Sequence, residues 1–136
     1  MKTWPVILII GLVLTLLALP VYAAASEQNA KVPKYDRAAE TVFKGVVEEV
    51  KDRECPISGG MGAHLMLKLG EGQILEVHLA TTKFVQNYEL VFSKGDEIQV
   101  TGTKVKFEDK DAILAREIKK GNDIFVFRDK DGKPVW

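Results

Sequence analysis

Two segments near the middle of the chain alternate strictly between apolar and polar residues. Residues 63–69 carry leucine at every second position, and residues 74–79 repeat the same alternation with Leu75, Val77 and Leu79. Because successive side chains of a β-strand point to opposite faces of a sheet, the pattern predicts two half-buried strands. The connection Gly70-Glu71-Gly72 favours an antiparallel hairpin with Gly72 in the left-handed conformation.

The short connection also predicts which residues of the hairpin face each other. Counting outward from it places Met66 opposite Glu76 and His64 opposite His78. A shift of one residue would put leucines opposite charged residues, so the alternation itself protects this register. The two histidines of the chain are therefore expected as cross-strand neighbours on the polar, solvated face of the hairpin.

The rest of the chain after residue 39 is expected to be mostly strand. Strands are predicted at residues 40–53, 97–107, 111–119 and 123–128. One helix is predicted at residues 81–92, where apolar residues recur at helical spacing and are expected to pack in the core: Phe84, Val85, Tyr88 and Val91. A bend is expected at Gly45, and a bulge at Gly102, where the apolar positions change parity.

This order of elements resembles the OB-fold. The resemblance is carried by residues 43–47, with the sequence Phe-Lys-Gly-Val-Val, and by residues 94–102, which open the fourth strand. The chain is similar to the small exported bacterial OB-fold proteins over about residues 40–119. The resemblance implies an all-β fold with one helix, a five-stranded Greek-key barrel, to which this chain adds a short extra C-terminal strand.

The N-terminal residues have the pattern of a targeting segment. Lys2 is followed by an apolar stretch, a break at Pro20 and small residues around Ala23, so residues 1–23 are expected to be a signal peptide. Residues 24–39 are expected to form a linker, and residues 40–136 the OB-fold domain. This predicts a periplasmic or secreted protein. The alternative is an inner-membrane anchor formed by residues 4–25, which approach the ~20 residues needed to span a bilayer.

The charge balance bears on the class of ligand. The chain has 19 basic and 19 acidic residues, so the basic excess typical of nucleic-acid binding is missing. A local basic rim remains open, formed by lysines that acidic residues interrupt: Lys104, Lys106, Lys110, Lys119 and Lys120. Binding of nucleic acid is therefore disfavoured.

The candidate binding residues follow from the resemblance. OB-folds usually bind ligands on strands two and three and on the loops joining strands one to two and four to five. The candidates in that region are Cys55, Met61, His64, Met66, Lys68, Glu76 and His78. Opposed side chains of a strand pair lie close enough to share an ion, so His64 and His78, completed by Cys55 or a methionine, form a candidate site for a soft metal or heme. Glycines in residues 55–62 would let that loop fold over the histidine face.

We therefore expect a non-enzymatic binding or assembly module of the bacterial cell envelope, with an envelope protein or a small ligand as partner. Soft-metal or heme binding is one alternative, and oligonucleotide or oligosaccharide binding is another. Cys55 beside a histidine could act as a nucleophile, but no sequence motif supplies an orienting carboxylate, so no enzyme is expected. As the only cysteine of the chain it has no partner for an internal disulfide, and its plain interpretation is a buried apolar residue.

Overall fold

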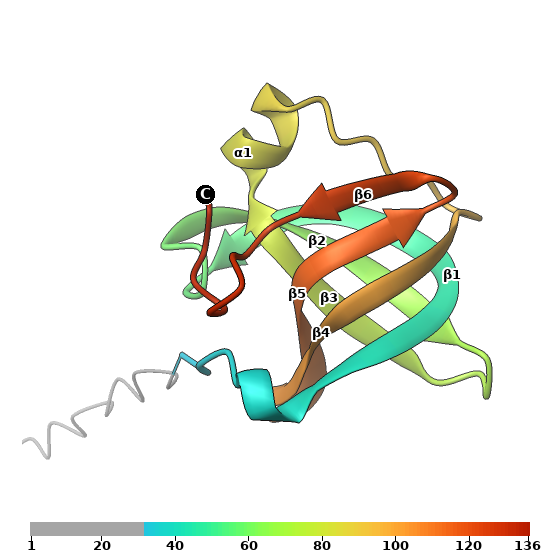
Figure 1. Cartoon of the computed structure of the whole chain (residues 1–136), viewed down its shortest axis with the longest axis horizontal. Coiled ribbons are helices and arrows are strands. Elements are labelled where there is room, and N and C mark those ends of the chain that lie inside the picture. Colours follow the sequence, from blue (N-terminus) through green and yellow to red (C-terminus); the bar gives the residue numbers. More distant parts are fainter. Residues whose placement is uncertain (1–31) are drawn as a thin grey trace, which may run out of the picture.

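The computed structural model describes residues 32–136, in which one β-sheet closes on itself (Figure 1). The strands are β1 (Glu40–Cys55), β2 (Gly60–Leu69), β3 (Ile74–Thr81), β4 (Glu97–Phe107), β5 (Lys110–Lys120) and β6 (Asp123–Val126), with a 3-10 turn η1 (Arg37–Ala39) and a helix α1 (Thr82–Asn87). The strand order is β3-β2-β1-β4-β5-β6, and a parallel contact between β3 and β5 closes the first five strands into a barrel. The predicted barrel, with its extra C-terminal strand, is confirmed.

Some of the predictions concern residues before residue 32, which the structure does not describe. The predicted signal peptide and the first half of the predicted linker, residues 24–31, lie there. No helix within residues 32–136 is both long enough and apolar enough to cross a membrane.

The β2–β3 hairpin has the register that the alternation predicts. Met66 pairs with Glu76, and His64 pairs with His78. Gly72 has a φ of 93°, the left-handed conformation expected for the connection. The inward-facing residues of the barrel strands are buried as the pattern indicates: Leu65, Leu67, Leu75, Val77, Ile98, Val100 and Leu114.

The strand β1 serves two partners. Its first half pairs with β4, its second half pairs with β2, and Gly45 pairs with both. A side chain at Gly45 would place its β-carbon 2.4 Å from the carbonyl oxygen of Lys68, so only glycine allows the strands to approach this closely. The predicted bulge of β4 is also present, because the β4–β5 register shifts between Thr101 and Gly102.

The helix α1 is shorter than predicted. The Thr81 side chain caps it by accepting a hydrogen bond of 3.2 Å from the Phe84 N–H, as expected, but Glu89 with a φ of 52° turns the chain away. Phe84 packs against the core, whereas Tyr88 is 67 % exposed and Val91 65 % exposed. The predicted core stripe is therefore only half correct, because its second half follows the end of the helix.

Glu40, at the start of β1, ties the N-terminal segment to the barrel. Its carboxylate accepts hydrogen bonds of 2.9 and 3.0 Å from Arg116 Nε and Nη2, and others from Arg37 and the Tyr35 hydroxyl. The Arg116 hydrogen bonds, followed by those from Tyr35 and Arg37, lower the pKa of Glu40 to about 2 even though desolvation opposes this. The folded state therefore favours the charged form of Glu40.

This lowered pKa predicts a pH-dependent stability. The stabilisation by Glu40 is fully present above its ordinary pKa of about 4.5 and is lost as the pH falls towards about 2. After allowance for solvent screening we expect a loss of about 1–2 kcal/mol in the free energy of unfolding. Urea unfolding from pH 7 to pH 2.5 measures it. The variant Glu40→Gln should show a smaller fall than the wild type, and equal falls would contradict the assignment.

Candidate metal centre

Three potential metal ligands from three strands meet at one end of the barrel. Cys55 ends β1, His64 lies on β2 and His78 on β3, and one donor atom from each lies within 4.8 Å of the other two. These side chains are almost fully buried, with exposed fractions of 2 %, 1 % and 2 %. The structure therefore brings together the three residues that the sequence selects as metal ligands, and we call them the Cys–His–His cluster.

The histidines are buried, and the prediction that they lie on a solvated face is wrong. The turn between β1 and β2 covers them, with Ser58 Oγ 2.7 Å from His78 Nε2. Trp136 packs beside His78, with the centres of the two rings 5.7 Å apart. Figure 1 shows this C-terminal segment returning towards the β1–β2 end of the barrel. Alternation within one hairpin carries no information about a cover built from other segments.

The hydrogen bonding of the cluster leaves two ring nitrogens without partners. His64 Nδ1 lies 2.8 Å from Glu76 Oε1, and Arg53 Nε binds the same oxygen at 2.8 Å. Within the described residues, His64 Nδ1, His64 Nε2 and His78 Nδ1 are buried without a directed hydrogen bond. His64 Nδ1 has Glu76 as an ion-pair partner, whereas the other two nitrogens have none in this part of the chain. A buried polar atom without a partner costs roughly 1–3 kcal/mol, so two of them in one cluster indicate an unmet coordination capacity.

The electrostatics of the cluster favour a thiolate. Burial alone would raise the pKa of the Cys55 thiol, but the His64 ring and the N–H groups of Ile57 and Ser58 bring it below its ordinary value. Burial alone would lower the pKa of His64, but Cys55 and Glu76 raise it. The thiolate is the form of cysteine that binds metal ions.

The pKa values of the neighbouring His78 and Glu76 are both lowered. Burial, followed by the charge of His64, lowers the pKa of His78 to about 3, so this ring stays neutral at ordinary pH. The hydrogen bond from His64, followed by that from Arg53, lowers the pKa of Glu76 to about 2 against the effect of desolvation. A neutral His78 can bind a metal ion, and a charged Glu76 can orient the His64 ring. Metal coordination needs these protonation states.

Gly62 forms one wall of the cluster. A β-carbon at this position would lie 2.5 Å from Ser58 Oγ, 3.0 Å from His64 Nε2 and 3.3 Å from Cys55 Cβ. Any side chain here would enter the space between the ligands. The expectation that a loop glycine allows close approach to the histidines is confirmed at this residue.

The other candidate residues are not part of the cluster, although Glu76 contacts His64. Met61 is 45 % exposed, in contrast to the cluster. Met66 and Glu76 line a separate cavity of about 560 Å³ beside the β4–β5 turn. Lys68 lines a hollow on another side of the barrel. Glu76 supports His64 without being a ligand, and neither methionine shares the cluster's nearly complete burial.

Residues that sequence reasoning missed complete the surroundings of the cluster. Ser58 was hidden because a serine before two glycines is typical of any turn, and Arg53 was hidden because charged residues are common on an exposed strand. The contact between His64 and Glu76 could have been found, since Glu76 is the diagonal neighbour of His64 in the predicted register.

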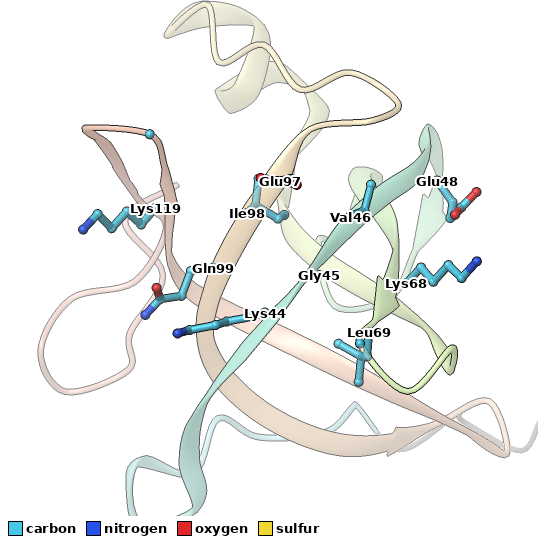
Figure 2. Close-up of a pocket in the computed structure, with 12 residues that line it drawn as sticks. Lys44, Gly45, Val46, Glu48, Lys68, Leu69, Glu97, Ile98, Gln99 and Lys119 are labelled. Atoms are coloured by element: carbon cyan, nitrogen blue, oxygen red, sulfur yellow. The ribbon is translucent and has the colours of Figure 1, made fainter.

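A broad hollow of about 780 Å³ crosses the middle of β1, away from the cluster. Figure 2 shows Lys44, Gly45 and Val46 passing between β4 and the end of β2. Its charged lining residues have both signs: Lys44, Lys68, Lys119, Glu48 and Glu97. Such a lining lacks the single sign that would focus a potential on a charged ligand.

The fold and the site define a small closed β-barrel that buries a cysteine and two histidines under a turn at one end. The chain belongs to the MamS/MamX magnetosome protein family, which it matches over residues 39–125. The match includes all three residues of the cluster and ends before the C-terminal segment. This family is a more specific assignment than the OB-fold resemblance, and the two agree. No curated protein sequence matches the chain.

Proposed function

We propose that this protein is a non-enzymatic binding module of the cell envelope with a magnetosome-related role, and that it holds one soft metal ion in the Cys–His–His cluster. The observation that carries the proposal is the burial of three donors within 4.8 Å of one another, with two ring nitrogens lacking partners. The family supports the magnetosome-related role. The signal-peptide pattern of residues 1–23 supports the envelope location.

The donor set indicates which ion fits. Thiolate and imidazole are ligands of Cu(I) and Zn(II), while hard ions such as Mg²⁺ and Ca²⁺ prefer oxygen. A Zn(II) site usually has four ligands. Among the His, Cys, Asp and Glu side chains of residues 32–136, the cluster supplies three donors. We therefore favour Cu(I) over Zn(II). A bare ion also suits the donors better than heme, since all three are buried close to one another and a porphyrin needs a wide slot.

The surroundings of the ligands support a metal site. Glu76 behind His64 gives the carboxylate–histidine arrangement that orients metal-bound imidazoles and raises their basicity. Arg53 Nε lies 2.8 Å from Glu76 Oε1 and helps to hold this carboxylate in place. Arg53 Nη2 also lies 3.4 Å from Glu108 Oε2. Ser58 fixes the other ring through His78 Nε2. Both histidines are thus oriented without using His64 Nε2 or His78 Nδ1.

Burial is the argument for binding over catalysis. Cys55, His64 and Glu76 follow the order of nucleophile, base and orienting carboxylate, which is the arrangement of a cysteine hydrolase. However, Cys55 is only 2 % exposed and His64 only 1 %, so a substrate would have to open the β1–β2 turn to reach the sulfur. A small ion needs far less space than a substrate does.

The test is titration of the reduced full-length chain with Cu(I), in competition with a chromogenic chelator, and separately with Zn(II). We expect one Cu(I) per chain with a Kd below about 1 μM, which corresponds to a free energy of binding more favourable than about −8 kcal/mol. The variants His64→Gln and His78→Gln should each weaken binding, and glutamine is chosen because both rings are buried. Failure of both ions to bind the wild type at micromolar concentrations would overturn the metal proposal.

A further inference from the structure

Arg128 is a buried cation that has no acidic partner within residues 32–136. It directly follows the last core residue, Phe127, and is 6 % exposed. Its Nη1 donates a hydrogen bond of 3.0 Å to the carbonyl oxygen of Gly132. Its Nε is buried and has no hydrogen-bond partner within residues 32–136. Burial of an unpaired charge is expensive, so an arginine in this position indicates a missing anion.

Aromatic rings hold the guanidinium of Arg128. The Tyr35 ring centre lies 5.3 Å from Arg128 Cζ, and the Trp136 ring centre lies 5.7 Å from it. Such cation–π contacts offset part of the desolvation, but they do not replace hydrogen bonds to the N–H groups. Burial lowers the pKa of Arg128, but arginine remains protonated in proteins. A charged group with a free Nε–H therefore remains.

The Arg128 side chain lines a cavity of mainly positive charge. Arg128 shares a cavity of about 350 Å³ with Lys34 and Lys133, while Asp131 is the acidic residue of its lining. The remaining walls are apolar or aromatic, among them Ile57 of the β1–β2 turn and Trp136. Three cations thus face one carboxylate, and no ion pair joins Asp131 to these cations within residues 32–136.

The cavity is built on an ordered turn. Asp129 Oδ1 accepts hydrogen bonds from the N–H groups of Asp131 and Lys133, at 2.8 and 3.0 Å. Gly132 has a φ of 83°, and a β-carbon on it would lie 2.5 Å from the Tyr35 ring. The turn therefore fixes the backbone of Lys133 and of Gly132, whose carbonyl oxygen binds Arg128, before any ligand arrives. Such preorganisation lowers the entropic cost of binding.

We propose that this cavity binds a phosphate group, with Arg128 as its anchor. The guanidinium is suited to two parallel hydrogen bonds with phosphate oxygens, and its Nε–H makes no hydrogen bond within residues 32–136. The excess of two cations over the lining carboxylate matches a doubly charged oxyanion. The site is independent of the metal proposal. Its Arg128, Lys133 and Trp136 lie beyond the residues that match the family.

The test is isothermal titration of the full-length chain with sodium phosphate at low ionic strength. We expect saturable binding with a Kd of about 0.1–1 mM. The variant Arg128→Lys keeps the charge but lacks the planar fork, so we expect binding at least ten times weaker, about 1.4 kcal/mol. The matched control is Lys130→Gln, which removes a charge from the same turn outside the cavity and should bind as the wild type does.

A second probe and a second variant complete the experiment. Vesicles of phosphatidylcholine, with and without phosphatidic acid, distinguish a lipid headgroup from free phosphate. Binding of either probe that depends on Arg128 supports the site. If Arg128→Lys fails to fold, Lys34→Gln combined with Lys133→Gln takes its place and should weaken binding several-fold. Binding of neither probe, or equal binding by the cavity variants and the wild type, overturns the proposal.

Discussion

Replacement of Cys55 by serine is expected to lower the affinity for Cu(I) by at least about 100-fold, beyond the range found when a supporting residue of a metal site is lost. The thiolate is the soft donor of the cluster, and the pKa of the Cys55 thiol is lowered, which favours that form. A serine hydroxyl stays protonated and is a hard oxygen donor. Serine is close to cysteine in size, so packing at this site, which is 2 % exposed, should change little. Chelator competition measures the affinity, and urea unfolding checks the fold.

The control for this prediction is Met61→Leu. Met61 is the sulfur-containing residue near the β1–β2 turn that sequence reasoning also selects, but its side chain is 45 % exposed. Leucine removes the thioether and keeps the apolar volume, so we expect unchanged affinity. Wild-type affinity in Cys55→Ser would instead show that the histidines hold the ion without the thiolate. A loss in Met61→Leu would place the methionine in the site.

The hairpin shows how far alternation alone can reach. The period-two pattern and the connection ending at Gly72 were sufficient to pair His64 with His78 correctly. Both are local properties, because register depends on the turn and on which face is apolar. The bulge at Gly102 was equally visible as a change of parity within one strand.

The burial of the site was not predictable in the same way. Both histidines are buried, and His78 contacts Ser58 of the β1–β2 turn and Trp136 at the C-terminal end. Ser58 lies just before β2, and its loop was expected to fold over the histidines, but the extent of burial was not. The contact of Trp136 with His78 joins segments far apart in the sequence, so it depends on the path of the whole chain. The length of the helix was also predicted wrongly. The helical spacing of apolar residues extends through Val91, but the helix ends at Asn87 and Glu89 adopts a left-handed conformation.

Trp136 lies between the two proposed sites. Its ring centre is 5.7 Å from the His78 ring centre and also 5.7 Å from Arg128 Cζ. One aromatic side chain thus packs beside His78 of the Cys–His–His cluster and lines the Arg128 cavity. A ligand in the cavity would therefore touch the residue that packs beside His78, although each site has its own donors and its own test.

The closed barrel itself predicts a large effect at Gly102. A β-carbon at this position would lie 2.2 Å from the carbonyl oxygen of Leu114 and 3.0 Å from Ile113 Cγ2. The nearest atom belongs to the backbone of the paired strand β5, so it cannot rotate away as a flexible side chain could. We expect Gly102→Ala to lower the free energy of unfolding by about 3 kcal/mol or more, at the upper end of overpacking effects.

The matched control is Gly70→Ala, the same chemical change at a glycine with no atom within 4 Å of the added β-carbon. Urea unfolding followed by circular dichroism compares both variants with the wild type. The control should stay within about 0.5 kcal/mol of it, as substitutions away from packed features usually do. If Gly102→Ala proved as stable as Gly70→Ala, the strands β4 and β5 would not approach each other at the bulge as described, and the β4–β5 pairing at this point would be wrong.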